Sequence, residues 1–160
     1  MKKIFLLLII CISVSCTGCF SEKKSPFYNS DWIMYNKDSE GERYYHLLSL
    51  KPDHTVTLTV SYVGSTNIIE WSGKYKINAK QIVFDFTECT RFENLQEVEK
   101  YTSGKIINYY NGKFLYSLGY VENEDKTNRY HLQLIRPGDF FLGDAIDIYG
   151  NQLEEFEKVE

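Results

Sequence analysis

The sequence lacks the motifs that most enzymes need. It contains only three histidines, His46, His54 and His131, and none stands in the His-Glu-x-x-His spacing of a zinc protease. It has no Gly-x-Ser-x-Gly turn for a nucleophilic serine, and Gly104-Lys105 lacks the upstream glycine of a phosphate-binding loop. We therefore expect no resident metal or cofactor and predict a protein that is not an enzyme.

Cysteine is nearly absent from the part of the chain that is expected to fold. Three of the four cysteines, Cys11, Cys16 and Cys19, lie at the N-terminus, which leaves Cys89 alone. A domain with one cysteine has no internal disulfide and must be held together by its own core. Because Cys89 has no Cys-x-x-Cys partner, we expect a small apolar core residue or a partly exposed thiol, not a nucleophile.

A basic stripe is also missing. The chain has 18 basic and 22 acidic residues, and Lys2 and Lys3 belong to an N-terminal leader. Without those two lysines, 16 basic residues face 22 acidic ones, so the formal charge of the remainder is −6. Proteins that bind nucleic acid concentrate positive charge on one face, so a nucleic-acid partner is not expected.

The leader has the composition of a secretory signal. Lys2 and Lys3 precede an apolar run over residues 4–14, which small residues follow. The run is too short to span a bilayer as a helix, because that needs about 20 residues. We therefore assign residues 1–18 to a signal peptide that is removed after export.

The end of the leader suggests how the protein is anchored. Cys16-Thr17-Gly18-Cys19 resembles the lipobox of bacterial lipoproteins, although Cys16 stands where that family has an aliphatic residue. The resemblance implies cleavage after Gly18 and fatty acyl chains such as palmitate on Cys19, hence a bacterial cell envelope location. Phe20 after Cys19 is compatible with the outer membrane of a Gram-negative host. The alternatives are acylation of Cys16 or an ordinary secretory signal.

Beyond a polar tether at residues 19–30, apolar residues alternate with polar ones. This period of two predicts strands at residues 32–35, 44–50, 55–63, 68–77, 81–86, 129–136 and 156–159. Gly73 interrupts one of these strands and suggests a bulge or a close backbone approach. The expected fold of residues 31–160 is mostly β, an antiparallel up-and-down meander of about eight strands in a closed or flattened barrel.

Asn111-Gly112 is the strongest local turn signal. Both residues tolerate the positive φ angles of a type I′ turn, so the sequence predicts a two-residue hairpin over residues 105–120. One face of that hairpin would carry six apolar residues towards the core: Ile107, Tyr109, Phe114, Tyr116, Leu118 and Tyr120. Residues 87–101 fit either one or two helical turns or a long irregular hairpin.

Three segments also carry a family resemblance. Residues 45–56, 71–77 and 81–84 look like the lipocalin-like domains of bacterial lipoproteins, except that His54 replaces the usual glycine of a turn. The resemblance implies a β-barrel lipoprotein and names no ligand. It also raises the possibility that Arg136 lies across Trp32, as late arginines do in lipocalins; a solvated Arg136 is the alternative.

Together these features predict a lipid-anchored binding protein of the cell envelope. Its ligand would be a small apolar molecule, an envelope component or a protein. The candidate ligand or core face consists of Trp32, Trp71, Tyr75, Tyr109, Phe114 and Tyr116. Two alternatives remain: a hydrolase of envelope polymers that uses Asp139, Asp144 or Asp147 with Glu154 and Glu155, and a structural envelope protein without a ligand.

Overall fold

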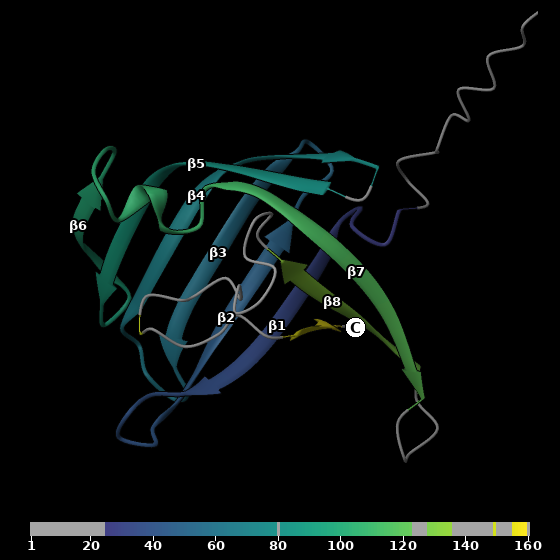
Figure 1. Ribbon diagram of the computed structural model, residues 1–160. Helices are drawn as coiled ribbons and strands as arrows, with labels where there is room; N and C mark the ends of the chain where they lie inside the picture. The colour runs from purple at the N-terminus through teal and green to yellow at the C-terminus, as the bar shows by residue number, and fades with distance from the viewer. Residues whose placement is uncertain (1–24, 80, 123–127, 136–148, 150–154, 160) are drawn as a thin grey trace, which may run out of the picture.

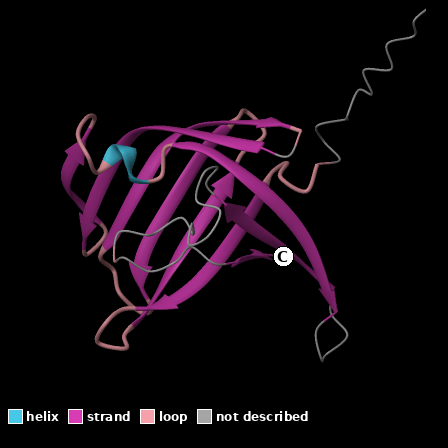
Figure 2. Cartoon of the chain, in the orientation of Figure 1, coloured by secondary structure: helices cyan, strands magenta, loops and turns pink. Residues whose placement is uncertain are grey.

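The computed structural model describes residues 25–79, 81–122, 128–135, 149 and 155–159. This part of the chain is almost entirely strand, with one short 3₁₀ turn (Figure 2). The strands are β1 (Ser30–Lys37), β2 (Arg43–Leu50), β3 (Thr55–Tyr62), β4 (Ile68–Asn78), β5 (Gln81–Glu93), β6 (Gln96–Tyr101), β7 (Gly112–Glu122), β8 (Asn128–Ile135) and β9 (Glu155–Val159). The turn is η2 (Ile107–Tyr109).

The strands close into a barrel (Figure 1). Each strand from β1 to β5 pairs antiparallel with the next, and β7, β8 and β9 continue the ring. The barrel closes because β9 pairs with β8 on one side and with β1 on the other. The predicted antiparallel meander of eight strands is thus confirmed and is consistent with a lipocalin-like barrel. The extra strand, β6, pairs with β5 alone among the described strands.

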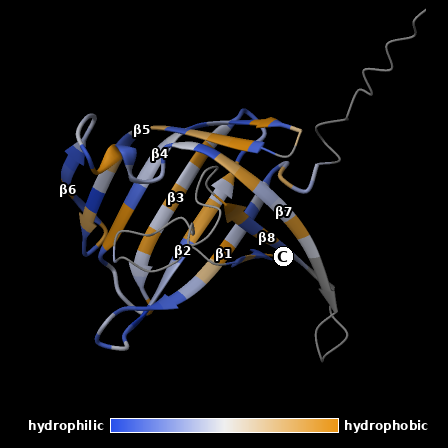
Figure 3. Ribbon diagram, viewed as in Figure 1, coloured by the Kyte–Doolittle hydropathy of each residue, from blue (hydrophilic) through white to orange (hydrophobic). Residues whose placement is uncertain are grey.

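Alternating side chains fill the barrel, as the sequence pattern predicts. On β3, Val56, Leu58 and Val60 are buried inside, whereas the intervening threonines point outwards and are half-exposed. Figure 3 shows the same alternation of apolar and polar residues along the strands. The largest fully buried side chains are Trp32, Trp71, Tyr44, Phe27, Phe86, Phe114, Phe156, Leu48, Leu50, Ile82, Leu132 and His46. Burial of this apolar surface is the main source of stability in a domain without a disulfide.

Gly73 marks a bulge, as predicted. The pairing of β4 with β5 shifts register between Ser72 and Gly73. A Cβ atom at position 73 would lie 2.2 Å from the backbone oxygen of Asp85, which is too close for any other residue. Glycine therefore allows the two strands to approach while the wall of the barrel bends.

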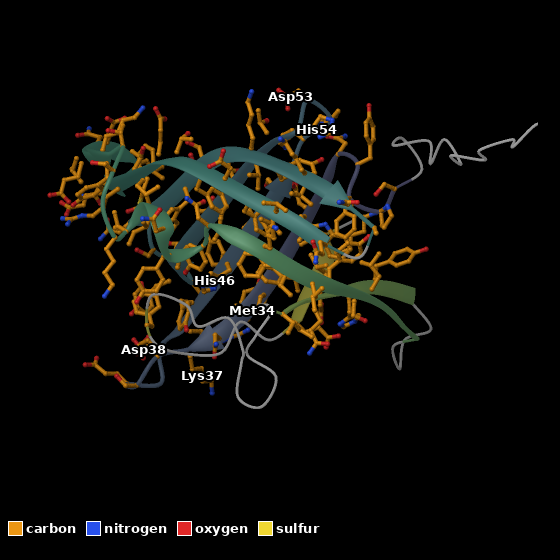
Figure 4. All side chains as sticks on the ribbon, turned by 45° about the horizontal axis from the view of Figure 1, so that its top comes forward. Met34, Lys37, Asp38, His46, Asp53 and His54 are labelled. Atoms are coloured by element: carbon orange, nitrogen blue, oxygen red, sulfur yellow. The ribbon has the colours of Figure 1, made fainter. Side chains whose placement is uncertain are left out.

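The two ends of the barrel are built from different turns. At what we call the near end lie the start of β1, the β2–β3 turn with Asp53 and His54, and the β4–β5 turn. At the far end lie the β1–β2 loop with Asp38, the β3–β4 loop and the β5–β6 turn. Figure 4 shows Asp53 and His54 at one end, Lys37 and Asp38 at the opposite end, and His46 between them.

Aromatic rings seal the near end. Phe27 precedes β1 in a short turn and is 1% exposed. Its ring centroid lies 5.8 Å from that of Trp32 and 4.8 Å from that of Tyr116 on β7. The folded unit therefore includes residues ahead of position 31, within the stretch that the sequence assigns to a tether.

The predicted hairpin at Asn111-Gly112 is wrong. Gly112 begins β7, which pairs with β5 through Ile82 and Phe114, and the segment before it forms η2 instead of a strand. The side chain of Asn111 accepts a hydrogen bond from the backbone N–H of Phe86 and donates one to the Phe86 carbonyl oxygen. Asn111 thus fills the place of a missing strand neighbour beside β5, and these long-range contacts override the local turn preference. Ile107 and Tyr109 accordingly do not share a strand face with Phe114.

Residues 87–101 form the irregular hairpin, one of the two structures that the sequence allowed. β5 continues to Glu93 and turns into β6, and their register shifts between Arg91 and Phe92. The first part of β5 pairs with β7, and its last part pairs with β6. The chain between β6 and β7, including η2, folds over the gap between these two neighbours.

Candidate functional site

The predicted ligand or core face belongs to the core. Trp32 and Trp71 are 0% exposed, and Phe114 and Tyr75 are also buried. Tyr109 and Tyr116 are half-buried and pack against this core. Side chains without exposed surface border no water-filled space, so the barrel around the two tryptophans is filled by its own side chains.

A polar aromatic cluster lies inside, towards the far end. Nε2 of His46 on β2 is 3.1 Å from the hydroxyl oxygen of Tyr110, which follows η2. The Tyr110 ring meets Trp71 edge to face, with centroids 4.8 Å apart. The indole N–H of Trp71 donates a 2.9 Å hydrogen bond to the carbonyl oxygen of Ile106. These contacts hold the segment around η2 against the barrel interior.

The sequence pointed to only half of this cluster. The alternation on β2 places His46 on the buried face with Leu48 and Leu50, which agrees with a structural histidine. The role of Tyr110 was missed because the sequence predicted a hairpin over residues 105–120, next to whose turn Tyr110 would lie. No local pattern signals a contact between residues so distant in sequence.

Three tyrosines, Tyr44, Tyr62 and Tyr149, gather closer to the far opening. The ring centroid of Tyr149 lies 4.6 Å from that of Tyr44 and 5.7 Å from that of Tyr62. Tyr44 is fully buried, whereas Tyr149 is 38% exposed. The hydroxyl of Tyr62 donates a 2.9 Å hydrogen bond to Oδ2 of Asp38. Burial, followed by this hydrogen bond, raises the pKa of Tyr62.

The Asp38 carboxylate holds the β1–β2 loop and is already saturated with donors. Its Oδ1 accepts hydrogen bonds from the backbone N–H groups of Glu40 and Glu42, both at 2.9 Å. Desolvation pushes the pKa of Asp38 upwards, but the hydrogen bonds from Tyr62 and the loop backbone outweigh it and lower the pKa. A low pKa suits a structural carboxylate and not a general acid.

We define the far rim as Val63–Asn67 and Asn94–Leu95; its Leu95 is the most exposed large apolar side chain among the described residues. Leu95 is 65% exposed and Val63 is 53% exposed. Three hydrogen bonds join the two parts of the rim. Leu95 N–H donates to the Thr66 carbonyl oxygen at 3.2 Å, Asn94 N–H to Asn67 Oδ1 at 3.1 Å, and Thr66 Oγ1 to Asn94 Oδ1 at 3.1 Å. The rim is therefore held in one shape before any partner binds.

Leu95 has an unusual backbone conformation. Asn94 and Leu95 form the two-residue turn between β5 and β6, with φ angles of 51° and 62°. Two positive φ values are typical of a type I′ turn, in which glycine normally takes the second position. For a leucine the left-handed region costs about 1–2 kcal/mol, and an exposed side chain recovers little of it by packing. Strain of this kind is frequent at functional positions.

Cys89 is a core residue. It is 0% exposed, and burial raises the pKa of its thiol to about 11. The thiol is therefore protonated near neutral pH, whereas a nucleophilic cysteine needs a lowered pKa. Of the two readings that the sequence left open, the structure supports the small apolar filler.

Several predicted features lie outside the described residues. These are the signal peptide, Cys19, Arg136, Asp139, Asp144, Asp147 and Glu154. Glu155 is described and exposed, with Oε2 3.5 Å from Nδ1 of His131. Among the described residues, no three histidine, cysteine or acidic side chains gather as metal ligands would. The same residues include no helix that is both long and apolar enough to cross a bilayer.

Comparison with known proteins identifies no relative. The chain matches no protein-family model, and the searches of curated proteins and of solved structures also return no match. Function is therefore inferred from the barrel, its filled interior and the far rim.

Proposed function

We propose that this chain is a lipid-anchored protein of a bacterial cell envelope that binds a protein partner and does not catalyse a reaction. The partner would be recognised at the far rim. The observation that carries this proposal is Leu95, a large apolar side chain that is 65% exposed on a strained and hydrogen-bonded turn.

The packed interior favours a protein partner over a small apolar ligand. A carrier barrel needs an apolar cavity of several hundred Å³, lined by side chains that the empty protein exposes to solvent. Here Trp32, Trp71 and Leu132 have no exposed surface. Recognition at the rim needs no such cavity, because loops at the end of a rigid barrel can carry the contacts.

The shape of the far rim suits association with a protein. Burying a leucine side chain such as Leu95 contributes about 1.5–3 kcal/mol, which is enough for a central contact of an interface. Since the backbone N–H groups of Asn94 and Leu95 already donate hydrogen bonds to Asn67 and Thr66, little conformational entropy is lost on binding. Leu95 and Val63 would insert into an apolar pocket of the partner.

The anchor is supported by the sequence of the leader and by the position of the near end. Cys19 precedes Ser25, the first described residue, by six positions, and six residues span at most about 20 Å. A lipid on Cys19 would therefore keep the near end close to the bilayer and leave the far rim accessible to other envelope proteins.

The binding proposal can be tested by photo-crosslinking in intact envelopes. Leu95, Val63 or the exposed wall residue Thr87 is replaced, one at a time, by a photo-reactive amino acid in the full chain. We expect the same discrete protein adduct from positions 95 and 63 and none from position 87. Leu95→Asp, combined with the photo-reactive residue at position 63, should weaken that adduct at least tenfold.

Two results would reject a protein partner at the far rim. One is an adduct of equal yield from position 87, and the other is no adduct from positions 63 and 95. Native mass spectrometry of the purified chain tests the competing function, carriage of a small apolar ligand. A bound small molecule of constant mass would favour that function. The anchor is tested separately, since [³H]palmitate should label the wild type and not Cys19→Ser.

A further inference from the structure

The near end carries a basic patch on an otherwise acidic protein. Lys74, Lys76 and Lys113 are all exposed on the outer wall there. We propose that these three lysines bind the phosphate groups of an anionic bilayer and so orient the barrel with its near end on the membrane. The inference rests on the proposed function, because the lipid on Cys19 supplies the permanent attachment.

Strand pairing brings the three lysines together. Val83 on β5 lies between Lys76 of β4 and Lys113 of β7, and it pairs with both. Since neighbouring strands are about 4.8 Å apart, the backbones of Lys76 and Lys113 are about 10 Å apart on one face. Lys74 projects from that face two residues before Lys76, about 7 Å along the strand. Such spacing matches several lipid headgroups and not a single small anion.

The lysines are available for a headgroup. None of the three has an ion pair among the described residues, whereas Lys51 and Lys100 each pair with a carboxylate. Among the described residues, exposed Asp85 pairs across the strands with Lys74, and Asp53 is hydrogen-bonded to Thr55, the other strand partner of Lys74. The patch therefore keeps a net positive charge.

A chain of contacts connects the patch to the place where the polypeptide enters the barrel. The Phe27 ring packs on Tyr116 of β7, and the Tyr116 hydroxyl donates a hydrogen bond to the carbonyl oxygen of Ala79 in the β4–β5 turn. Lys76 precedes Ala79 by three residues, and Lys113 precedes Tyr116 by three. A tether at Ser25 thus emerges on the side of the barrel that carries the lysines.

The opposite end carries no excess of positive charge. Its loops and the β5–β6 hairpin expose five glutamates beside five cations, and Arg91 is ion-paired with Glu93 and Glu99; the glutamates are Glu40, Glu42, Glu93, Glu97 and Glu99, and the cations are Lys37, Arg43, Arg91, Lys100 and Lys105. An anionic surface therefore attracts the lysine patch without an equal attraction for the far end, and this turns the far rim away from the bilayer. Because each lysine near an anionic surface strengthens binding about fivefold, three lysines give on the order of 100-fold.

The orientation can be measured in vesicles that carry the anchored full chain. A fluorophore is attached to a cysteine introduced by Asn78→Cys at the near end or by Glu40→Cys at the far end; Cys89 is buried and does not compete for the label. Quenching by headgroup-labelled lipid reports proximity to the bilayer. In phosphatidylglycerol vesicles at low salt we expect strong quenching at position 78 and weak quenching at position 40.

Variants and salt separate the lysine patch from the anchor. Lys74→Gln/Lys76→Gln/Lys113→Gln should reduce the difference between the two positions to the part that the anchor alone supplies, and so should about 0.5 M salt or pure phosphatidylcholine. The matched control Lys37→Gln/Lys100→Gln/Lys105→Gln removes the same charge elsewhere and should keep the difference. Equal quenching at positions 78 and 40 in the wild type would overturn the inference, as would a difference in the first variant that is as large as in the wild type.

Flotation of the protein with the vesicles reports the lipid anchor on its own. If the protein does not float with phosphatidylcholine vesicles, the proposed anchor fails. Even without the anchor, the lysine patch predicts that the protein floats with phosphatidylglycerol vesicles at low salt and not at high salt. Binding to these vesicles should be about 100-fold weaker in Lys74→Gln/Lys76→Gln/Lys113→Gln. Absence of that flotation would overturn the inference as well.

Discussion

The two ends of the barrel are closed by different chemistry. At the near end, the rings of Phe27, Trp32 and Tyr116 pack together. Towards the far end, polar groups on aromatic rings make directed contacts, from Tyr110 to His46 and from Tyr62 to Asp38. Apolar packing supplies stability without fixing direction, whereas hydrogen bonds fix the position of loops. The near end thus serves mainly stability, and the far end holds its loops in a defined shape.

The largest effect is expected at Gly73, close to the near end of β4. Gly73→Ala places a methyl group against the backbone of Asp85, so we expect the loss of about 3 kcal/mol or more in the free energy of unfolding. In Gly119→Ala the nearest atom is 3.8 Å away, so this variant should remain close to the wild type. Urea titration followed by circular dichroism compares them, and equal stability of the two variants would contradict the close approach.

Removing the ring that seals the near end should have the next largest effect. Phe27→Ala leaves a cavity beside Trp32 and is expected to cost about 3 kcal/mol. The half-exposed neighbour Tyr28 is the control, and Tyr28→Ala should cost less than about 1 kcal/mol. If Phe27→Ala were no worse than Tyr28→Ala in urea titrations, the near end would not depend on this ring.

Cys89 lies in the far-end half of β5, where it pairs with Trp71 of β4. We expect its thiol to make the protein less stable in alkali. Burial raises the pKa of its thiol to about 11, above the 9.0 of a solvated thiol. Between these pH values the unfolded thiol loses its proton and the folded one keeps it, so stability falls as pH rises. Two pKa units correspond to about 2–3 kcal/mol. The free energy of unfolding, measured from pH 8 to pH 11, should fall less steeply with pH in Cys89→Ala than in the wild type. Identical slopes would show that the Cys89 thiol does not cause the loss.

A smaller effect is expected for the polar contact inside the far end. Tyr110→Phe removes the hydroxyl group that meets His46 Nε2 and should cost about 1–2 kcal/mol in urea titrations. Tyr45→Phe, on the outer wall, removes a hydroxyl from a half-exposed ring and should change stability by less than about 0.5 kcal/mol. Equal effects of both variants would show that the buried contact adds nothing.

The smallest effect has the opposite sign. Leu95→Gly relieves the left-handed strain at the far rim and should raise the free energy of unfolding by up to about 1 kcal/mol. The same variant should abolish the crosslink from position 63 if the leucine side chain holds the partner. If Leu95→Gly were less stable than the wild type and still crosslinked fully from position 63, Leu95 would be neither strained nor required for binding.

Long-range contacts explain where prediction from sequence succeeded and where it did not. The alternation of Thr55 to Tyr62 and the glycine at position 73 are local signals, and the structure follows both. Asn111-Gly112 is an equally strong local signal, yet the positive φ angles of a two-residue turn occur at Asn94-Leu95 instead. There, hydrogen bonds to Thr66 and Asn67 support the turn that the leucine disfavours.

The candidate site depended even more on contacts that the sequence does not display. Leu95 lies within residues 87–101, for which the sequence left helical turns and an irregular hairpin open, and its exposure follows from the turn of that hairpin. His46 was correctly expected on a strand, but its partner Tyr110 lies on a segment whose fold is set by Trp71 and Phe86. Such features become visible only once the strands are paired.

The position of β9 has a consequence for biogenesis. Its few residues bridge β8 and β1, and they follow all the other strands of the barrel along the chain. Until residues 155–159 are available, the ring stays an open sheet with two bare edges, and such edges invite pairing between copies. If the chain is exported as proposed, this order is useful, because translocation requires an unfolded polypeptide.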